Sequence, residues 1–349
     1  MSEITLIGID LAKNIFRINC VDENGKRIMN KNMHRDSVIK FFAPLPECTV
    51  AMEACASAHY WGRTIESLGH KVKLIHPRYV TPYRLGDKND ANDAAAICAA
   101  AQRPDMRFVR LRSQRQSDIQ ALHRVREGLV TEKTATINRV RALLAENGIV
   151  IRQGPANVMG SLPSIMDDPC NELSGLMRHL LRGQYEHLVH LCGQLTELED
   201  QLRVLVAEEE DYKYLMQIPG VGLITATLLG SEIGNGSAFR NGRTFAAYLG
   251  LVPRQHSSGG KNMLLGISKR GNRYLRTLLI HGARTALRSI LLGRSPFGGG
   301  VVESWALALL ERRGKNKTIV GLANKLARMA WAMLAKRTVF QKVMYIPAH

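Results

Sequence analysis

Four acidic side chains, Asp10, Glu53, Asp90 and Asp93, have types and positions that suit chemistry on a phosphate. Asp10 ends the apolar run ITLIGID, and Glu53 lies in the later run CTVAMEA. Asp90 and Asp93 share one face of a predicted helix, where like charges repel unless a cation offsets them. Carboxylate oxygens are hard ligands suited to Mg2+, and two such ions roughly 4 Å apart can stabilise the attacking and leaving oxygens of a phosphoryl transfer. Each acid alone is more often a helix cap or a solvated side chain, and we expect that ordinary role for Asp87.

The elements that must position these acids can be predicted from the hydrophobic period over residues 1–110. Short apolar or alternating runs predict strands, and one of them turns at an Asn-Gly pair. Longer segments with helical spacing separate the strands and follow them. The predicted strands cover residues 4–10, 15–33 as a hairpin, 48–54 and 71–77, and the predicted helices cover 36–42, 59–68 and 89–101. This order predicts a mixed α/β sheet domain, with Asp10 and Glu53 at the ends of neighbouring strands.

A central region, residues 111–210, has a helical pattern. Residues 113–147 predict one long helix, and leucines at alternating spacings of three and four predict a second helix with a coiled-coil seam. The stripe can be the inside of an antiparallel helical hairpin, a contact between subunits, or both. Residues 148–175 between the two helices are rich in Gly, Pro, Asn and Ser, which predicts a connecting loop. The leucines of the stripe are Leu188, Leu191, Leu195, Leu198, Leu202 and Leu205.

The last region, residues 211–349, is predicted to be mainly α and carries most of the excess positive charge. Residues 251–349 contain 18 of the 48 Lys and Arg residues, but only Glu303 and Glu311 as acids. A segment with this charge repels itself unless a polyanion neutralises it, and nucleic acid is the usual partner. A solubilising surface is the less favoured explanation. The side chains that we expect to contact nucleic acid are Arg254, Lys261, Lys269, Arg270, Arg273 and Arg276.

The segment IPGVG makes a tight connection between two helical patterns and resembles the hairpin of helix-hairpin-helix DNA-binding units. In such a unit, backbone N–H groups at a helix N-terminus face a phosphate. This interpretation makes Gly220 and Gly222 nucleic-acid-binding residues. A plain turn between helices is nearly as well supported.

The composition sets outer limits on the kind of protein. At 349 residues and 45% hydrophobic content, the chain is long enough for two or three globular domains. It has no apolar run of the roughly 20 residues that a membrane helix needs, and no basic leader at its start, so we expect a cytoplasmic protein. The six cysteines form no CxxC pair, which argues against a zinc ribbon or a disulfide framework.

Several motifs together resemble one family of bacterial insertion-sequence transposases. GIDLAKN, AMEACASAHYW and DKNDANDAAAI are similar to its N-terminal RuvC-like, DEDD-type domain. IPGVGLITATLL, FAAYLGLVPRQHSSGGK and GISKRGNRYLR are similar to its C-terminal transposase domain. The family is related to the Piv and MooV invertases and is guided by a bridge RNA. These motifs span most of the chain in the family's order.

The resemblance implies a fold and a mechanism. The implied fold is an α/β RNase H-like (RuvC-like) metal-binding domain over residues 1–110, a helical coiled-coil region over 111–210 and a basic transposase domain over 211–349. Asp10, Glu53, Asp90 and Asp93 would form the Mg2+ site, and Ser258 would be the nucleophile that forms a covalent phosphoserine intermediate with DNA. Ser257 adjoins it and is the alternative nucleophile. The implied partners are double-stranded DNA of the element ends and target, a noncoding bridge RNA, and further copies of the chain in a dimer or tetramer. When bound to DNA, the protein would be associated with the nucleoid.

Other classes of protein share some of these features. A RuvC-type junction endonuclease would use the same acids to activate water and would not need Ser258. A non-catalytic nucleic-acid-binding protein would need only the basic C-terminal region. An actin-like ATPase or sugar kinase also begins with a GID strand, but the sequence shows no convincing second phosphate loop.

Overall fold

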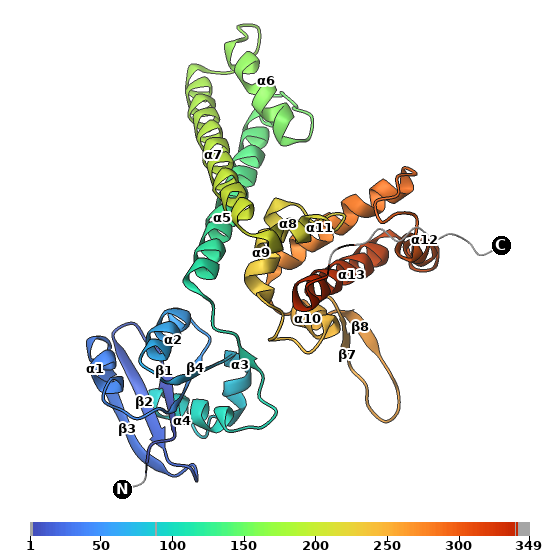
Figure 1. Cartoon of the computed structure of the whole chain (residues 1–349). Coiled ribbons are helices and arrows are strands. Elements are labelled where there is room, and N and C mark those ends of the chain that lie inside the picture. Colours follow the sequence, from blue (N-terminus) through green and yellow to red (C-terminus); the bar gives the residue numbers. More distant parts are fainter. Residues whose placement is uncertain (1–2, 88, 339, 341–349) are drawn as a thin grey trace, which may run out of the picture. The chain divides into compact units, whose positions relative to one another are not determined.

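The computed structural model describes residues 3–87, 89–338 and 340 of the chain. The protein consists of two compact units, Met1–Ser117 and Asp118–His349, and Figure 1 shows both. Each unit has hydrophobic clusters of its own. Among the described residues, no helix is both long enough and apolar enough to cross a membrane.

The first unit is built on a mixed sheet of six strands. The strand order is β3-β2-β1-β4-β5-β6. The central strands β1, β4 and β5 are parallel neighbours, whereas β2, β3 and β6 pair antiparallel. This topology is consistent with an RNase H-like fold and confirms the predicted mixed sheet. The strands are β1 (Leu6–Asp10), β2 (Ile15–Val21), β3 (Arg27–His34), β4 (Thr49–Glu53), β5 (Lys71–Ile75) and β6 (Phe108–Val109), the last of which the sequence pattern did not predict.

Helices cover both faces of this sheet. Side chains alternate between the faces along each strand. One face, with Ile7 and Ile9, packs against α1 (Val38–Phe42) and α2 (Ala58–Ser67). The opposite face, with Leu6 and Ala51, packs against α4 (Asp90–Ala101). Short helical segments complete the unit: η1 (Arg35–Ser37), α3 (Pro77–Val80) and η2 (Thr81–Tyr83).

Helix α4 lies unusually close to strand β1 because of Gly8. A Cβ atom at Gly8 would lie 2.6 Å from the Ala94 carbonyl oxygen and 2.7 Å from Cys98 Sγ, so any side chain there would push the helix away. The buried Asn19 side chain adds a polar contact, since its Nδ2 lies 3.4 Å from Cys98 Sγ. These contacts fix the position of α4 on the sheet.

A long helical hairpin begins the second unit. Helices α5 (Gln114–Ala145) and α7 (Gly175–Glu208) run antiparallel, as shown by hydrogen bonds from Arg126 to Glu199 and from Arg139 to Gln184. Within the predicted leucine stripe, Leu188, Leu191, Leu195 and Leu202 are buried inside the chain. The structure therefore supports the hairpin interpretation of the stripe.

The prediction of a connecting loop over residues 148–175 is wrong, because this segment contains helix α6 (Pro155–Asp167). Pro155 occupies the first turn of α6, where the missing N–H costs nothing, and Pro163 lies inside the helix. Val158, Leu162 and Met166 are buried in one cluster with residues of α5 and α7. Tertiary packing on the hairpin thus outweighs the loop-like composition.

The remainder of the second unit is mainly α, as predicted. Residues of α9, α11 and α13 form most of its core, which includes Leu229, Leu279 and Leu326. One two-stranded sheet, β7 paired with β8, extends from this core (Figure 1). The elements are α8 (Glu210–Met216), α9 (Leu223–Ile233), α10 (Gly242–Tyr248), β7 (Pro253–Gln255), β8 (Leu264–Ile267), α11 (Arg273–Leu291), α12 (Val301–Arg313) and α13 (Lys315–Lys336).

A polar network joins the helical hairpin to this core. Arg126 on α5 donates to Glu199 at 2.7 Å and to the Tyr274 hydroxyl on α11 at 2.9 Å. His123 Nε2 is hydrogen-bonded to Thr227 on α9 at 3.0 Å, and burial, assisted by the positive charge of Arg126, lowers the pKa of His123 to about 4. His123 is therefore a neutral, structural histidine at physiological pH.

The segment IPGVG packs directly on α11. Gly220 has φ +86°, and a Cβ built on Gly282 would lie only 2.0 Å from the Gly220 carbonyl oxygen. We expect Gly282→Ala to lower the free energy of unfolding by about 1–3 kcal/mol, because backbone must move to relieve the clash. Gly193→Ala is the matched control, since Gly193 lies inside α7 and its Cβ would meet no atom within 4 Å.

Urea unfolding of both variants followed by circular dichroism tests this expectation. The control should be as stable as the wild type or more stable, by up to about 1 kcal/mol, because alanine favours helix over glycine. Equal stability of the Gly282 variant and the control would show that the close approach is not needed.

Candidate active site and nucleic-acid interface

Asp10 and Glu53 lie at the carboxyl ends of neighbouring parallel strands, as the sequence pattern predicted. Ile9 of β1 pairs with Met52 of β4, so Asp10 and Glu53 occupy the next position along each strand. Gly8 and Ala51 face α4. Asp10 and Glu53 follow them by two positions on the same strands, so they lie on the same side of the sheet as α4. Both side chains are partly buried.

Asp90 and Asp93 lie in the first turn of α4. Asn89 caps this helix by accepting a hydrogen bond from the Asn92 N–H at 2.8 Å. Asp90 is exposed, whereas the side chain of Asp93 is only 19% exposed and accepts a hydrogen bond from Arg84 Nη1 at 3.1 Å. The contact of α4 with Gly8 places this turn near the end of β1 that carries Asp10.

The donor set fits a divalent metal ion in its chemistry. All four side chains supply hard carboxylate oxygens, and they come from two adjacent strand ends and one helix turn. In the described part of the chain, no three His, Cys, Asp or Glu side chains are gathered closely enough to hold a metal. All four residues thus lie on one side of the sheet, but their side chains are not gathered into a metal site.

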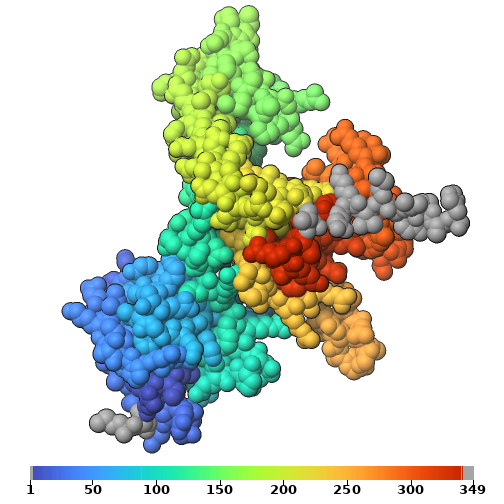
Figure 2. All heavy atoms as spheres, in the orientation of Figure 1, coloured from blue at the N-terminus to red at the C-terminus, as the bar shows by residue number. Residues whose placement is uncertain are grey.

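Ser258 lies at the tip of the β7–β8 hairpin. Lys261 N–H donates to the Ser258 carbonyl at 3.0 Å, and Gly259 and Gly260 between them have φ +54° and +77°. These values are typical of the two-residue turn that suits a β-hairpin. Figure 2 shows the hairpin as a narrow protrusion of its unit, coloured light orange.

The two neighbouring serines differ in their hydrogen bonds. The Ser257 hydroxyl oxygen accepts from the Met263 N–H at 3.2 Å and from Gln255 Nε2 at 3.1 Å, so it holds the hairpin together. Ser258 is exposed, and across the described residues its hydroxyl makes no hydrogen bond to the protein. The Ser258 side chain is therefore the one open to a substrate.

Most of the cations predicted to bind nucleic acid are exposed on or near this hairpin. Arg254 lies on β7, and Lys261 follows the two-glycine turn. Lys269 and Arg270 follow β8, and Arg273 begins α11. All five side chains are exposed, so their positions suit contacts with phosphate.

Arg276 and Gly220 have structural roles that the sequence pattern did not predict. Arg276 is only 8% exposed and donates to the carbonyls of Leu249 and Arg270 at 3.0 and 2.7 Å. Gly220 is packed against Gly282, as described above. These contacts favour a structural role for both residues over the predicted phosphate contact. Gly222 is exposed at the start of α9, where the backbone N–H groups are open to an anion.

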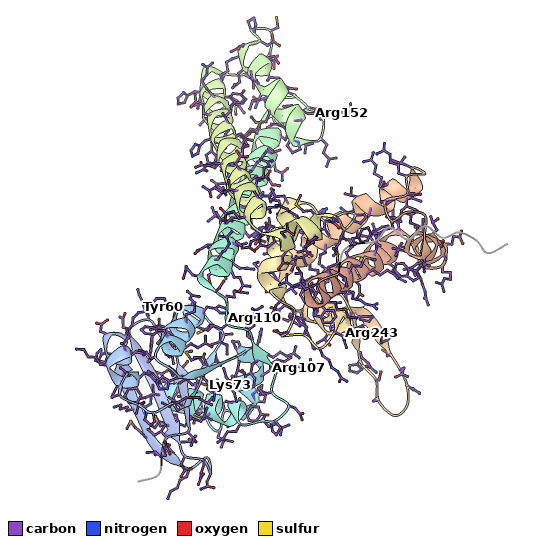
Figure 3. All side chains as sticks on the ribbon, viewed as in Figure 1. Tyr60, Lys73, Arg107, Arg110, Arg152 and Arg243 are labelled. Atoms are coloured by element: carbon purple, nitrogen blue, oxygen red, sulfur yellow. The ribbon has the colours of Figure 1, made fainter. Side chains whose placement is uncertain are left out.

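Two further groups of cationic side chains could contact nucleic acid, although the sequence pattern did not predict them. Lys73, Arg107 and Arg110, labelled in Figure 3, come from β5 and the two ends of β6, and Lys73 Nζ lies 5.0 Å from the centre of the Phe108 ring. Arg243, also labelled there, belongs with Lys325 and Arg328 to a group on the second unit. Neither group lies in a recognisable motif, so only the fold reveals them.

Comparisons with known proteins place the chain among transposases. The model of the "Transposase IS116/IS110/IS902 family" matches residues 212–293, and a DEDD-type model described as "Transposase" matches residues 7–148. A "Probable family 20 transposase" of Pseudomonas aeruginosa is 44% identical over 97% of this chain and 99% of its own length. The "Transposase for insertion sequence element IS1328" of Yersinia enterocolitica is 42% identical over 98% of this chain and all of its own length. The "Pilin gene-inverting protein" of Moraxella lacunata is 24% identical over 97% of this chain and 98% of its own length.

The fold, the site and these matches define a transposase, an enzyme that cuts and joins DNA. Its DEDD-type, nuclease-like domain implies a divalent metal ion, and its class implies binding of insertion-sequence DNA. The chain belongs to the IS116/IS110/IS902 family of transposases.

Proposed function

We propose that this transposase cuts and rejoins DNA through a covalent intermediate on Ser258. The observation that carries the proposal is the hairpin tip, where the Ser258 hydroxyl is exposed and without a protein partner among the described residues. The exposed cations around the hairpin would hold the DNA strand by its phosphates.

The proposed reaction balances as a transesterification. The Ser258 hydroxyl loses its proton as its oxygen bonds to phosphorus, and the bond from phosphorus to the departing sugar oxygen breaks. That sugar oxygen then takes up a proton. Rejoining is the same exchange with the hydroxyl of another DNA strand as the attacking group, so no external energy source is needed.

We propose Asp10, Glu53, Asp90 and Asp93 as the residues that hold Mg2+. Bound there, the ion would polarise the phosphate and favour loss of the serine proton. The four carboxylates would position the ion through their oxygens, and Arg84, the present partner of Asp93, would have to release that side chain.

We further propose that a noncoding bridge RNA guides the choice of DNA and that the active form is a dimer or tetramer. Resemblance to the bridge-RNA-guided family supports both proposals. Lys73, Arg107 and Arg110 on the first unit would offer a surface for a second nucleic acid.

The test combines the purified protein, Mg2+, element-end DNA and the noncoding RNA of the element. The DNA products are separated on a denaturing gel, with and without RNA and with and without a chelator. A protein–DNA adduct that survives denaturation and needs both RNA and metal would support the proposal. Nicked DNA without any adduct would instead indicate a RuvC-type nuclease that activates water.

A further inference from the structure

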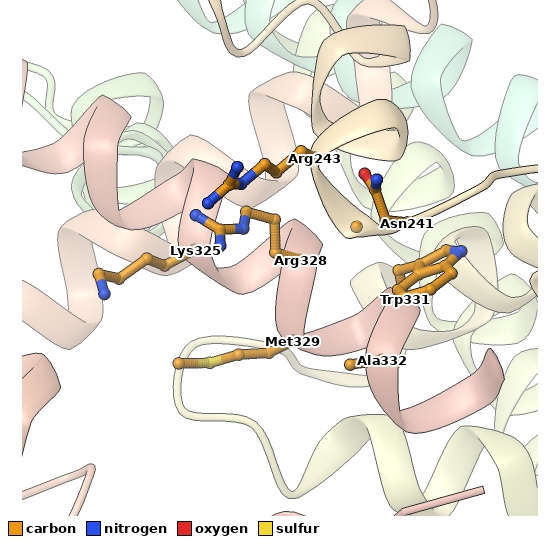
Figure 4. Close-up of a pocket in the computed structure, with 8 residues that line it drawn as sticks. Asn241, Arg243, Lys325, Arg328, Met329, Trp331 and Ala332 are labelled. Carbon is orange, nitrogen blue, oxygen red and sulfur yellow. The ribbon is translucent and has the colours of Figure 1, made fainter. Parts of the chain in front are cut away.

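A cationic cavity of about 510 Å3 lies in the second unit, away from the β7–β8 hairpin in sequence. It is formed between the start of α10 and the second half of α13, and Figure 4 shows it in close-up. Its lining includes Asn241, Arg243, Lys325, Arg328, Met329 and Trp331. Among the described residues that line it, none has an acidic side chain.

Three cationic side chains line this cavity, those of Arg243, Lys325 and Arg328. Arg243 and Arg328 come from different helices but line the same cavity, as drawn in Figure 4. Within the described residues, neither arginine makes an ion pair or a side-chain hydrogen bond. Lys325, one helical turn before Arg328, has its Nζ 4.4 Å from the centre of the Trp305 ring and no carboxylate partner in the described part.

The backbone holds the two arginines in place. A Cβ at Gly242 would lie 3.1 Å from both the Cα and the carbonyl oxygen of Arg328, so α10 begins in direct contact with α13. Asn241 caps α10 by accepting from the Thr244 N–H at 2.9 Å. Arg243 and Arg328 are therefore fixed as neighbours by rigid elements, whatever their side chains bind.

The physical environment favours an anion at this position. Burial, followed by the charge of Arg328, lowers the pKa of Lys325. The surroundings of Lys325 therefore disfavour its protonated, positively charged form. Each guanidinium group presents a planar set of N–H donors that matches the oxygens of a phosphate. When one guanidinium group donates two parallel hydrogen bonds to a phosphate, the orientation of the phosphate is fixed. Met329 and Trp331 also line the cavity, to which they add apolar atoms.

We propose that the cavity binds a backbone phosphate of the DNA duplex, through Arg243 and Arg328 with support from Lys325. This inference rests on the proposed function, because the phosphate comes from the DNA that the transposase handles. It adds a binding site on α10 and α13, distinct from the serine hairpin and from the four acids.

The test compares two double variants. Arg243→Gln with Arg328→Gln removes both charges at the cavity while keeping side chains of similar polarity. Arg288→Gln with Arg313→Gln is the matched control, because these arginines are exposed on α11 and α12 and do not line the cavity. Binding to an element-end duplex is measured by fluorescence anisotropy at several salt concentrations, and circular dichroism checks the fold.

We expect the cavity variant to bind roughly tenfold more weakly, because charged hydrogen bonds are lost. The slope of log Kobs against log salt should become shallower by about 1 for one lost phosphate contact. The control should stay within about twofold of the wild type. An unchanged slope in the cavity variant, or an equal loss in the control, would overturn the inference.

A second arm identifies the source of the phosphate. Thermal unfolding is measured with inorganic pyrophosphate against chloride at matched ionic strength. If pyrophosphate stabilises the wild type but not the cavity variant, and the DNA slope is unchanged, the cavity takes a free anion and the DNA assignment is wrong. A wild type that does not bind the duplex even when the noncoding RNA of the element is present would contradict the proposed function, and with it the DNA assignment of the cavity.

Discussion

The Ser258→Ala protein is expected to form no covalent adduct with element-end DNA. Ser258 would supply the oxygen that bonds to phosphorus, and alanine has none, so adduct and strand transfer should fall to background. Ser257→Ala should retain the adduct at a rate reduced by only a few fold. Its hydroxyl accepts hydrogen bonds from Met263 and Gln255, and their loss loosens the hairpin without removing the nucleophile.

A denaturing gel of the wild type and both variants provides the measurement, and DNA binding by anisotropy provides the control. All three proteins should bind the duplex with similar affinity. An adduct that disappears only in Ser257→Ala would move the nucleophile by one residue. Equal nicking by all three proteins without any adduct would refute covalent serine chemistry.

The second large effect is expected from the acids. Asp10→Asn and Glu53→Gln each keep the shape of the side chain but remove a charged ligand. Substitution of groups that only support a ligand already costs about 10–100-fold in metal affinity or activity, so loss of a ligand should cost more than roughly 100-fold in cleavage. Asp90→Asn should behave in the same way. Titration with Mn2+, followed by electron paramagnetic resonance, should show a matching loss of metal binding.

Asp87→Asn is the matched control for these substitutions. Asp87 is exposed in the segment before α4, and we expect its substitution to leave metal binding and cleavage unchanged. Circular dichroism should show that every variant folds, and anisotropy should show that every variant still binds DNA. Unfolding of the Asp10 or Glu53 variant would make these acids structural, and full activity would exclude them from the site.

The sheet unit could be predicted closely from the sequence because its signals are local. The run ending at Asp10 became β1, the run containing Glu53 became β4, and the helix expected over 89–101 became α4 with Asn89 as its cap. Apolar runs of strand length and a capping side chain before a helix act through neighbouring residues, so one sequence suffices to recognise them. The helices α5 and α7 were predicted for the same reason, whereas the choice between a hairpin and a contact between subunits depends on burial, which the sequence pattern does not give.

Features that depend on distant residues could not be predicted. Helix α6 is stabilised by packing of Val158 and Leu162 on the hairpin, which its Gly- and Pro-rich composition conceals. The burial of Arg276 depends on the carbonyl of Leu249, far back in the chain. The pairing of Arg243 with Arg328 at one cavity joins two helices that share no motif.

The ion pair between Arg84 and Asp93 bears on how the enzyme responds to metal supply. Asp93, one of the proposed ligands, is held in this structure by the guanidinium group of Arg84. Loading a divalent ion is then an exchange, in which an internal monovalent partner gives way to an ion from solution.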